Sequence, residues 1–213
     1  MIAILEYGMG NVGSIVNMLK KVGVAAGTIT TAYEIEGAQS LIIPGVGHID
    51  NAIERLESAG LRDALDDAAM RRCIPILGIC LGMQIMTRSS EEGRRQGLGW
   101  VPATATRFDG ETLGLRVPHM GWNVVNLRKP NLCFDGDGFD ERRFYFVHSY
   151  AVHCEDPADV LTSTTYGIEF VSAFQRKNLT GVQFHPEKSH KFGESFFRRY
   201  LAGNNGQPLN AAS

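Results

Sequence analysis

A cysteine between two glycines is the first residue whose setting points to chemistry. The segment GICLG, residues 78–82, follows an apolar run at 74–79 and precedes a helical pattern at 81–88. This spacing is typical of a nucleophile elbow, a sharp strand-to-helix turn that exposes the nucleophile, here Cys80. The glycines allow neighbouring backbone to come close, and the positive end of the helix favours the thiolate. The amide of Leu81 is placed to donate a hydrogen bond to an oxyanion.

The elbow alone leaves open a second interpretation, a buried structural cysteine between two helix-packing glycines. The sequence holds three other cysteines, Cys73, Cys133 and Cys154, and none forms a CxxC pair or has zinc-ligand spacing with a histidine. We expect those three to be free, buried and inert thiols. The sequence predicts no metal site.

A histidine and a glutamate two positions apart form the second half of the pattern. They lie in QFHPE, residues 183–187, at the end of a strand-like run. Residues two apart in an extended segment point the same way, so Glu187 can hold one nitrogen of His185 while the other faces a thiol. An elbow cysteine together with this pair predicts a Cys80–His185–Glu187 catalytic triad.

Composition narrows the possible partners. The chain has 213 residues, of which 44% are hydrophobic and 21% are charged, and its formal net charge is −2. These values are ordinary for one globular domain and give no electrostatic reason to expect nucleic acid or a membrane as a partner. No signal peptide or membrane span is predicted, so we expect a cytoplasmic protein. We expect the domain to cover residues 1–202, with a disordered tail at 203–213.

Alternating strand and helix patterns must position these residues. The first half predicts strands at 2–5, 40–43 and 74–79, and helices at 14–22 (with Ser14 as N-cap), 50–58, 61–72 and 81–88. The second half predicts strands at 101–108, 114–117, 123–127, 143–150, 160–163, 168–175 and 180–184, then a helix at 192–201. The pattern predicts an α/β fold with an open, mostly parallel sheet flanked by helices and additional antiparallel strands in the second half.

The sequence resembles the class I glutamine amidotransferases over almost its whole length. The two signatures are GICLGMQ around Cys80 and GVQFHPEKS around His185. It resembles the glutaminase subunits of imidazole glycerol phosphate synthases more narrowly, through EYGMGN (6–11), PGVG (44–47), SSEEG (89–93), PHMGWN (118–123) and FVHSY (146–150). Several short motifs in the same order are far more specific than one.

This resemblance implies the flavodoxin-like fold of the family and a role for each matching residue. It implies that the backbone amides of Val46 and Leu81 form the oxyanion hole. It implies a glutamine site made of Gly45, Gly47, Gln84, His148, Ser149 and Tyr150. It also implies a partner-facing set made of Met120, Trp122, Asn123, Tyr150 and Lys188.

The resemblance also implies an activity. Glutamine would be hydrolysed to glutamate and ammonia without a metal or organic cofactor. The ammonia would pass through a channel to a (β/α)₈ cyclase subunit, which makes imidazole glycerol phosphate and AICAR in histidine biosynthesis, in a heterodimer. FVHSYAVHC, YGIEFVSA and HPEKSHKFG are similar to a branch of the family encoded for surface-polysaccharide synthesis, in which a sugar amidotransferase would receive the ammonia.

Two alternatives from other classes remain. GMGNVG, residues 8–13, matches the dinucleotide-binding pattern G-x-G-x-x-G, with Glu34 or Glu36 as the later acid. We expect this alternative to fail because residues 27–33 are polar and show no second strand that ends at the acid. A stand-alone cysteine hydrolase would use the same elbow, and activity without any partner protein would favour it.

Overall fold

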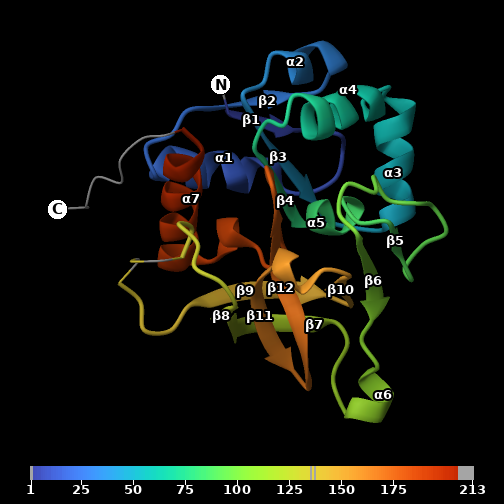
Figure 1. Cartoon of the computed structure of the whole chain (residues 1–213), viewed down its shortest axis with the longest axis vertical. Helices are drawn as coiled ribbons and strands as arrows, with labels where there is room; N and C mark the ends of the chain where they lie inside the picture. Colours follow the sequence, from blue (N-terminus) through green and yellow to red (C-terminus); the bar gives the residue numbers. More distant parts are fainter. Residues whose placement is uncertain (1, 135, 137, 206–213) are drawn as a thin grey trace.

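The computed structural model of the protein describes residues 2–134, 136 and 138–205, and a parallel sheet forms its centre (Figure 1). Five parallel strands lie in the order β2-β1-β3-β4-β13, which is the flavodoxin-like order. Their bounds are β1 (Ile2–Leu5), β2 (Ala26–Ile29), β3 (Ser40–Gly45), β4 (Ile76–Cys80) and β13 (Leu179–Val182). The carboxyl ends of β3, β4 and β13 therefore meet at one edge of the sheet.

Strands that are antiparallel to their neighbours, apart from the parallel pair β5–β6, extend this sheet beyond β13, and two more form a second, smaller sheet. β12 pairs with β13, and the sheet continues through β10 and β6 to β5, while β11 joins β12 to β8. Their bounds are β5 (Ser89–Ser90), β6 (Ala103–Arg107), β8 (Asn126–Leu127), β10 (Tyr150–Cys154), β11 (Val160–Tyr166) and β12 (Ile168–Arg176). The smaller sheet pairs β7 (His119–Val124) with β9 (Arg143–His148). The predicted α/β architecture is confirmed.

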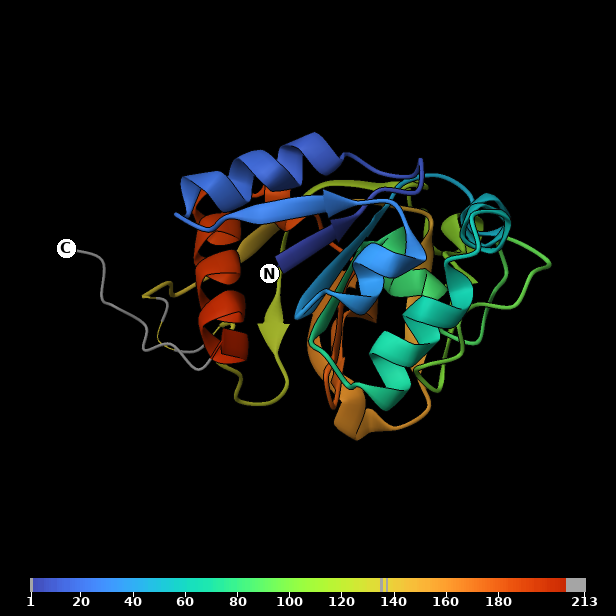
Figure 2. The ribbon, with the colours of Figure 1, turned by 90° about the horizontal axis from the view of Figure 1, so that it is seen from above.

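Helices cover both faces of the parallel strands (Figure 2). α1 and α7 pack on one face, and α3 and α4 pack on the other, each over its own apolar cluster. The helices are α1 (Val12–Lys21), α2 (Ala32–Glu36), α3 (Ile49–Ser58), α4 (Arg62–Asp66) with a π-helical continuation (Asp67–Arg71), α5 (Leu81–Ile85), α6 (Gly110–Leu113) and α7 (His190–Asn205). Short 3₁₀ turns span Pro157–Asp159 and Pro186–Lys188. In the described part of the chain, no helix is both long and apolar enough to cross a membrane.

Three local predictions were wrong, each because of capping or pairing that the pattern does not reveal. The side chain of Asn11 caps α1 by accepting a hydrogen bond from the Ser14 amide at 3.1 Å, so Ser14 is not the N-cap. Residues 114–117 are not a strand, because Gly114 ends the short helix α6 in a left-handed conformation. The expected strand at 143–150 is two strands, which belong to different sheets and meet at Ser149.

Two boundaries also differ from expectation. β2, at 26–29, overlaps the segment 27–33 that we expected to lack a strand; it is an edge strand, and Ile29 is its one fully buried residue. α7 continues through residues 203–205, which we assigned to the tail. The rest of the expected tail, 206–213, lies outside the described residues.

Candidate active site

Close packing of backbone on backbone forms the turn at Cys80. Cys80 has φ 55° and ψ −110°, a conformation that is uncommon for a residue with a side chain, and it joins the end of β4 to α5. A Cβ atom on Gly82 would lie 1.9 Å from the Ile43 carbonyl oxygen, and one on Gly78 would lie 2.5 Å from the Gly82 carbonyl oxygen. The glycines on either side of the cysteine are therefore required by space, as the elbow pattern predicts.

The histidine and the glutamate meet directly after β13. Nδ1 of His185 lies 2.7 Å from Oε1 of Glu187, and both side chains are almost fully buried. The backbone amide of His185 donates to the carbonyl of Tyr145 on β9 at 2.8 Å, and this hydrogen bond fixes the backbone that carries the imidazole. Nε2 of His185 is buried and makes no hydrogen bond among the described residues, so this nitrogen remains available to a reacting group.

The charge of His185 depends on its neighbours. Burial alone disfavours an imidazolium, but hydrogen bonding and the negative charges of Cys80 and Glu187 outweigh it and raise the pKa of His185 to about 10. Burial, together with the charge of Cys80, also raises the pKa of Tyr7 far above its usual value. An imidazolium at His185 is therefore stabilised by the negative charges beside it.

Two glutamines link the thiol to the pocket wall. Gln183 donates from Nε2 to Sγ of Cys80 at 3.7 Å, and its Oε1 accepts from Nε2 of Gln84 at 2.9 Å. The thiol itself points to the Val147 carbonyl at 3.8 Å. Gln183 was not among the predicted site residues, although it lies in the histidine signature. Its position two residues before His185 on the same extended segment is the signal that could have identified it.

A cavity of about 230 Å³ opens at the thiol. It brings together most of the residues that the resemblance assigned to glutamine or to the oxyanion. Its lining consists of Val46, Gly47, Cys80, Leu81, Gln84, Glu92, Pro118, Val147, His148, Ser149 and Tyr150. Gly45 does not line the cavity; it pairs in register with Cys80 at the end of β3 and packs against the backbone of α5. The roles of these residues stay predictions.

Glu92 is a pocket residue that residue-by-residue reasoning did not single out. Its carboxylate accepts from the amide of Ile49 at 2.9 Å, so it lies between the start of α3 and the cavity. The loop that follows is fixed: Asp50 accepts from the amides of Arg94 and Arg95. The only signal in the sequence was its place in the SSEEG motif.

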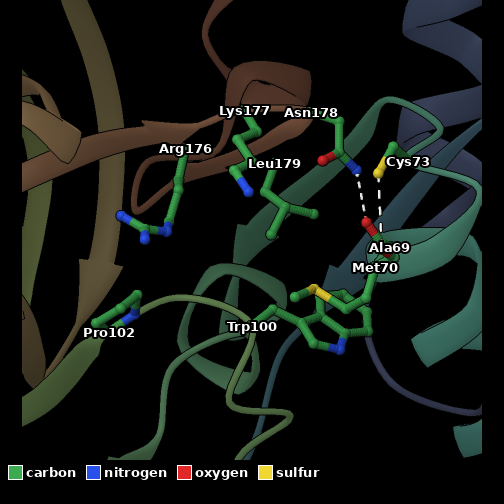
Figure 3. A pocket seen from close by; sticks show the side chains of 9 residues that line it. All are labelled: Ala69, Met70, Cys73, Trp100, Pro102, Arg176, Lys177, Asn178 and Leu179. Carbon is green, nitrogen blue, oxygen red and sulfur yellow. Dashed lines mark hydrogen bonds between the residues drawn. The ribbon is translucent and has the colours of Figure 1, made fainter.

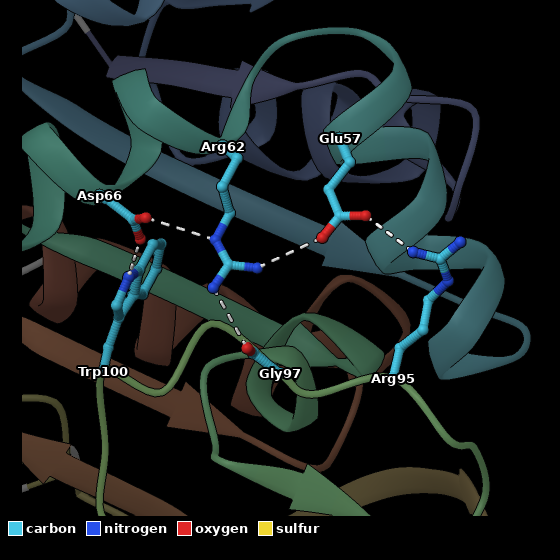
Figure 4. A network of polar contacts seen from close by, with 6 residues as sticks. All are labelled: Glu57, Arg62, Asp66, Arg95, Gly97 and Trp100. Carbon is cyan, nitrogen blue, oxygen red and sulfur yellow. Dashed lines mark hydrogen bonds and ion pairs between the residues drawn. The ribbon is translucent and has the colours of Figure 1, made fainter.

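A polar network holds the rest of this loop against α3 and α4 (Figure 4). Glu57 binds Arg95 and Arg62, and Arg62 reaches the carbonyl of Gly97 at 3.3 Å. Asp66 accepts from the indole of Trp100 at 2.6 Å. Because the loop is anchored along residues 94–100, Glu92 has a defined position at the cavity.

Of the predicted partner-facing residues, three lie on β7 of the smaller sheet, whereas Tyr150 begins β10 of the large sheet and Lys188 ends the 3₁₀ turn at 186–188. The side chains of Met120 and Trp122 are 62% and 45% exposed, and both point outward from β7. Trp122 stacks on His190 and borders a hollow that Lys188 also lines. Asn123 lies on the opposite face of β7, where it donates to the carbonyl of Thr165 at 2.9 Å. The role of each of these residues in an interface stays a prediction.

A second cavity, of about 160 Å³, lies at the amino end of β4 (Figure 3). Met70, Trp100 and Lys177 border it, together with Cys73. Cys73 is exposed, so the expectation that it is buried was wrong; it lies in a turn after the helical segment, where nothing covers it. Cys133 is buried and Cys154 is partly buried.

The glycine-rich loop at 8–13 has a packing role. Gly10, at φ 93°, would place a Cβ atom 3.1 Å from both Pro44 and the Gly45 amide, so the loop supports the end of β3. β2 does form the second strand of the dinucleotide pattern, so our reason for rejecting that pattern was wrong. Glu34, however, is not a free acid at the end of β2: its carboxylate accepts from Thr30 and Thr31 as the capping box of α2.

Comparison with known proteins agrees with this geometry. The family described as "Glutamine amidotransferase class-I" matches residues 3–201. The chain belongs to the class I glutamine amidotransferases. This amidotransferase is therefore an enzyme, and the predicted family is confirmed. A solved structure described as a glutamine amidotransferase has a TM-score of 0.74 at 17% identity and covers 96% of this chain and 98% of its own.

Curated relatives are much closer in sequence. This amidotransferase is 47% identical over 201 residues to "Imidazole glycerol phosphate synthase subunit HisH 2" of Methanococcus maripaludis, covering 94% of this chain and 98% of the relative. It is 42% identical over 204 residues to "Imidazole glycerol phosphate synthase subunit HisH" of Leptospira borgpetersenii, covering 95% of this chain and 100% of the relative.

Proposed function

We propose that this amidotransferase is the glutaminase subunit of an imidazole glycerol phosphate synthase, acting in histidine biosynthesis. The observation that carries the proposal is the cavity at Cys80, beside which His185 and Glu187 form a buried pair. The relatives at 42–47% identity that carry this subunit name support the choice of synthase. Free thiols at Cys73, Cys80, Cys133 and Cys154 fit the cytoplasmic location that we propose.

The reaction begins with proton transfer between Cys80 and His185. The imidazole takes the thiol proton on Nε2, and Glu187 stabilises the imidazolium through Nδ1. The thiolate then attacks the side-chain carbonyl carbon of glutamine. A carbon–sulfur bond forms, and the carbonyl electron pair moves onto oxygen.

The resulting oxyanion needs hydrogen-bond donors on the cavity wall. Val46 and Leu81 both line the cavity, so their backbone amides are the donors that we assign. His185 returns its proton to the leaving nitrogen, the carbon–nitrogen bond breaks, and ammonia departs. Water, deprotonated by His185, then hydrolyses the γ-glutamyl thioester to glutamate and restores the thiol.

The far end of the cavity suits the backbone end of glutamine. The substrate carries an α-ammonium and an α-carboxylate, and Glu92 supplies a negative charge for the former. Gln84, Ser149 and Tyr150 line the same space and offer polar groups for orientation. Gly47, at φ 119°, allows the chain to turn beside the substrate without a side chain in the way.

Ammonia released into water would be protonated and lost to the synthase. We therefore propose that a (β/α)₈ cyclase subunit docks over Met120, Trp122 and Lys188 in a heterodimer and receives ammonia through a channel. The outward position of these side chains beside the triad segment supports this arrangement. The peptide between Gly45 and Gly47 is flanked by glycines, so its amide can rotate cheaply when the partner binds.

The test is glutamate production by the chain alone, with the cyclase, and with the cyclase and its nucleotide substrate. We expect a poor glutaminase alone and an increase on the order of 10²–10³ in the full complex, the effect of supplying one oxyanion donor. Cys80→Ser in the complex is the control: the cyclase should then work with free ammonium but not with glutamine.

Other outcomes would redirect the proposal. Equal turnover under all three conditions would contradict dependence on a partner and favour a stand-alone hydrolase. Stimulation by a sugar amidotransferase but not by the cyclase would keep the glutaminase chemistry and change only the acceptor.

A further inference from the structure

The strand β7 presents two different faces. Met120 and Trp122 point outward and are exposed, whereas His119 and Asn123 point into the protein. Gly121 separates the two outward side chains and has φ 129°. Any displacement of the outer face of this short strand therefore moves His119 and Asn123 as well.

His119 is a polar side chain in an aromatic cluster. Its ring stacks on Tyr166 at 4.1 Å and on Phe146 at 4.9 Å between centroids, and only 3% of the residue is exposed. It lies opposite His148 in the β7–β9 pairing. A phenylalanine would fill this space equally well, so packing alone does not explain a histidine here.

Both ring nitrogens of His119 are used. Nδ1 lies 2.9 Å from Nε2 of His148, and Nε2 lies 3.2 Å from the amide nitrogen of Asn123. Nδ1 of His148 lies 2.8 Å from the Tyr150 carbonyl, which can only accept, so this nitrogen carries the proton. Nε2 of His148 then accepts from Nδ1 of His119, and Nε2 of His119 accepts from Asn123.

The hydrogen bonds continue to the nucleophile, with their direction reversed at the Tyr150 carbonyl, which accepts from both sides. The Tyr150 carbonyl also accepts from Nε2 of Gln84 at 3.4 Å. Gln84 donates to Gln183, and Gln183 donates to Sγ of Cys80, as described above. A continuous hydrogen-bonded chain thus joins the inner face of β7 to the thiol, through His148 and Tyr150 at the cavity wall.

The chain requires both central imidazoles to be neutral. Burial lowers the pKa of His119 to about 4, and burial, with the nearby His119 and His185, lowers the pKa of His148 to about 3. Both rings therefore keep one donor and one acceptor at neutral pH, so the direction of the hydrogen bonds from Asn123 to the Tyr150 carbonyl is fixed.

We propose that His119 is a positioning residue through which the outer face of β7 holds the ring of His148 in place and so sets the shape of the glutamine pocket. This rests on the proposed function, since it assigns the route by which a subunit docked on Met120 and Trp122 acts on Cys80. His119 does not touch the substrate; it acts through His148, which lines the cavity.

The test uses His119→Phe, which keeps the ring but removes both hydrogen bonds, and His119→Asn, which restores a donor near the position of Nδ1. Tyr166→Phe is the matched control, because it loses a hydrogen bond to the Arg116 carbonyl in the same cluster but outside the chain. Asn123→Ala breaks the chain at its far end and leaves the buried ring in place if His119→Phe folds poorly.

Two measurements are made on each variant. The first is the ratio of glutaminase turnover with the cyclase and its substrate to turnover alone; His119→Phe should lower this ratio by at least about fivefold, the lower end of ordinary coupling between sites, while His119→Asn recovers part of it. The second is made on the isolated chain and has two parts: ¹⁵N NMR spectra of the histidine rings, and the rate at which a glutamine-mimicking diazoketone inactivates the protein.

In the wild type, His148 should show a protonated Nδ1 and no titration near neutral pH. His119→Phe should change that spectrum and slow inactivation, and Tyr166→Phe should do neither. Equal inactivation and unchanged His148 signals in His119→Phe and Tyr166→Phe would overturn the inference with or without a partner. Absence of stimulation in the wild type would count against the proposed function alone.

Discussion

Strand β4 has a cysteine near each end, and the two differ in almost everything except backbone strain. Cys73 precedes the strand with φ 51°, and Cys80 ends it with φ 55°. Each borders a cavity. Cys73 is exposed, and its thiol donates to the carbonyl of Met70 in the preceding helical segment at 3.6 Å. Cys80 is buried among Gln183, His185 and the start of α5.

The difference follows from the direction of the parallel strands. At the amino end, the chain has just left the C-terminal end of a helical segment, where carbonyls and partial negative charge disfavour a thiolate. At the carboxyl end, it enters α5, and β13 delivers His185 to the same edge. A strained cysteine beside a cavity is therefore not sufficient for a nucleophile; its edge of the sheet decides which groups surround it.

Exchanging each cysteine for serine gives the largest expected contrast. Cys80→Ser should lower glutamine-dependent turnover by about 10⁶-fold, as loss of a triad nucleophile does, because an alcohol is a much poorer nucleophile at this site. Cys73→Ser should leave turnover unchanged. The first measurement is glutamate release by each variant in the complex. The second is mass spectrometry of the wild-type chain after reaction with the diazoketone, to locate the adduct. Adducts on Cys73 instead of Cys80 would break the comparison.

The next largest effect concerns Glu187, which holds His185 at the carboxyl end of β4 and has no counterpart beside Cys73. Glu187→Gln should lower turnover by up to about 10⁴-fold, because the imidazolium loses its charged partner while the thiol remains. The pKa of His185 should fall as well, since Glu187 helps to raise it. A pH profile of turnover and of diazoketone labelling measures both. Wild-type turnover in this variant would show that Glu187 only supports the fold.

The smallest expected effect concerns the positive φ that the two cysteines share. Glycine relieves a positive φ, so Cys73→Gly and Cys80→Gly should each change the free energy of unfolding by no more than about 1 kcal/mol, with relief of strain offsetting glycine's greater loss of entropy. Only Cys80→Gly should abolish activity. The measurement is chemical denaturation, in which the dependence of the unfolding free energy on denaturant concentration should be the same for each variant and the wild type. A large loss of stability in Cys80→Gly alone would mean that its side chain is needed for packing.

The sequence was informative where chemistry needs a fixed local spacing. The elbow around Cys80 and the alternating pair of His185 and Glu187 are short-range patterns, and the structure places both at the carboxyl edge of β4 and β13, where Cys80 borders the cavity. The parallel sheet covered by helices could also be predicted, because buried parallel strands are continuous apolar runs, whereas its flavodoxin-like order was implied by the resemblance. β2 escaped because an edge strand needs few apolar residues.

The remainder depends on contacts between distant segments. His119 appears in the sequence only as part of a motif, and its role depends on an opposite residue 29 positions away. Glu92 gains its position from Ile49, 43 residues earlier. Exposure of Cys73 follows from where the helical segment ends. No local pattern encodes such pairings, because they are set by register and topology.

The position of β13 has a consequence for biosynthesis on the ribosome. This strand lies between β4 and β12 in the sheet, yet it is the last strand of the described chain. Until residues 179–182 emerge, the nascent protein has an unpaired apolar edge along β4, the kind of edge that recruits other strands. The histidine follows three residues after that strand. We therefore expect glutaminase activity and protection from aggregation to be acquired together, once β13 and the histidine after it have been made.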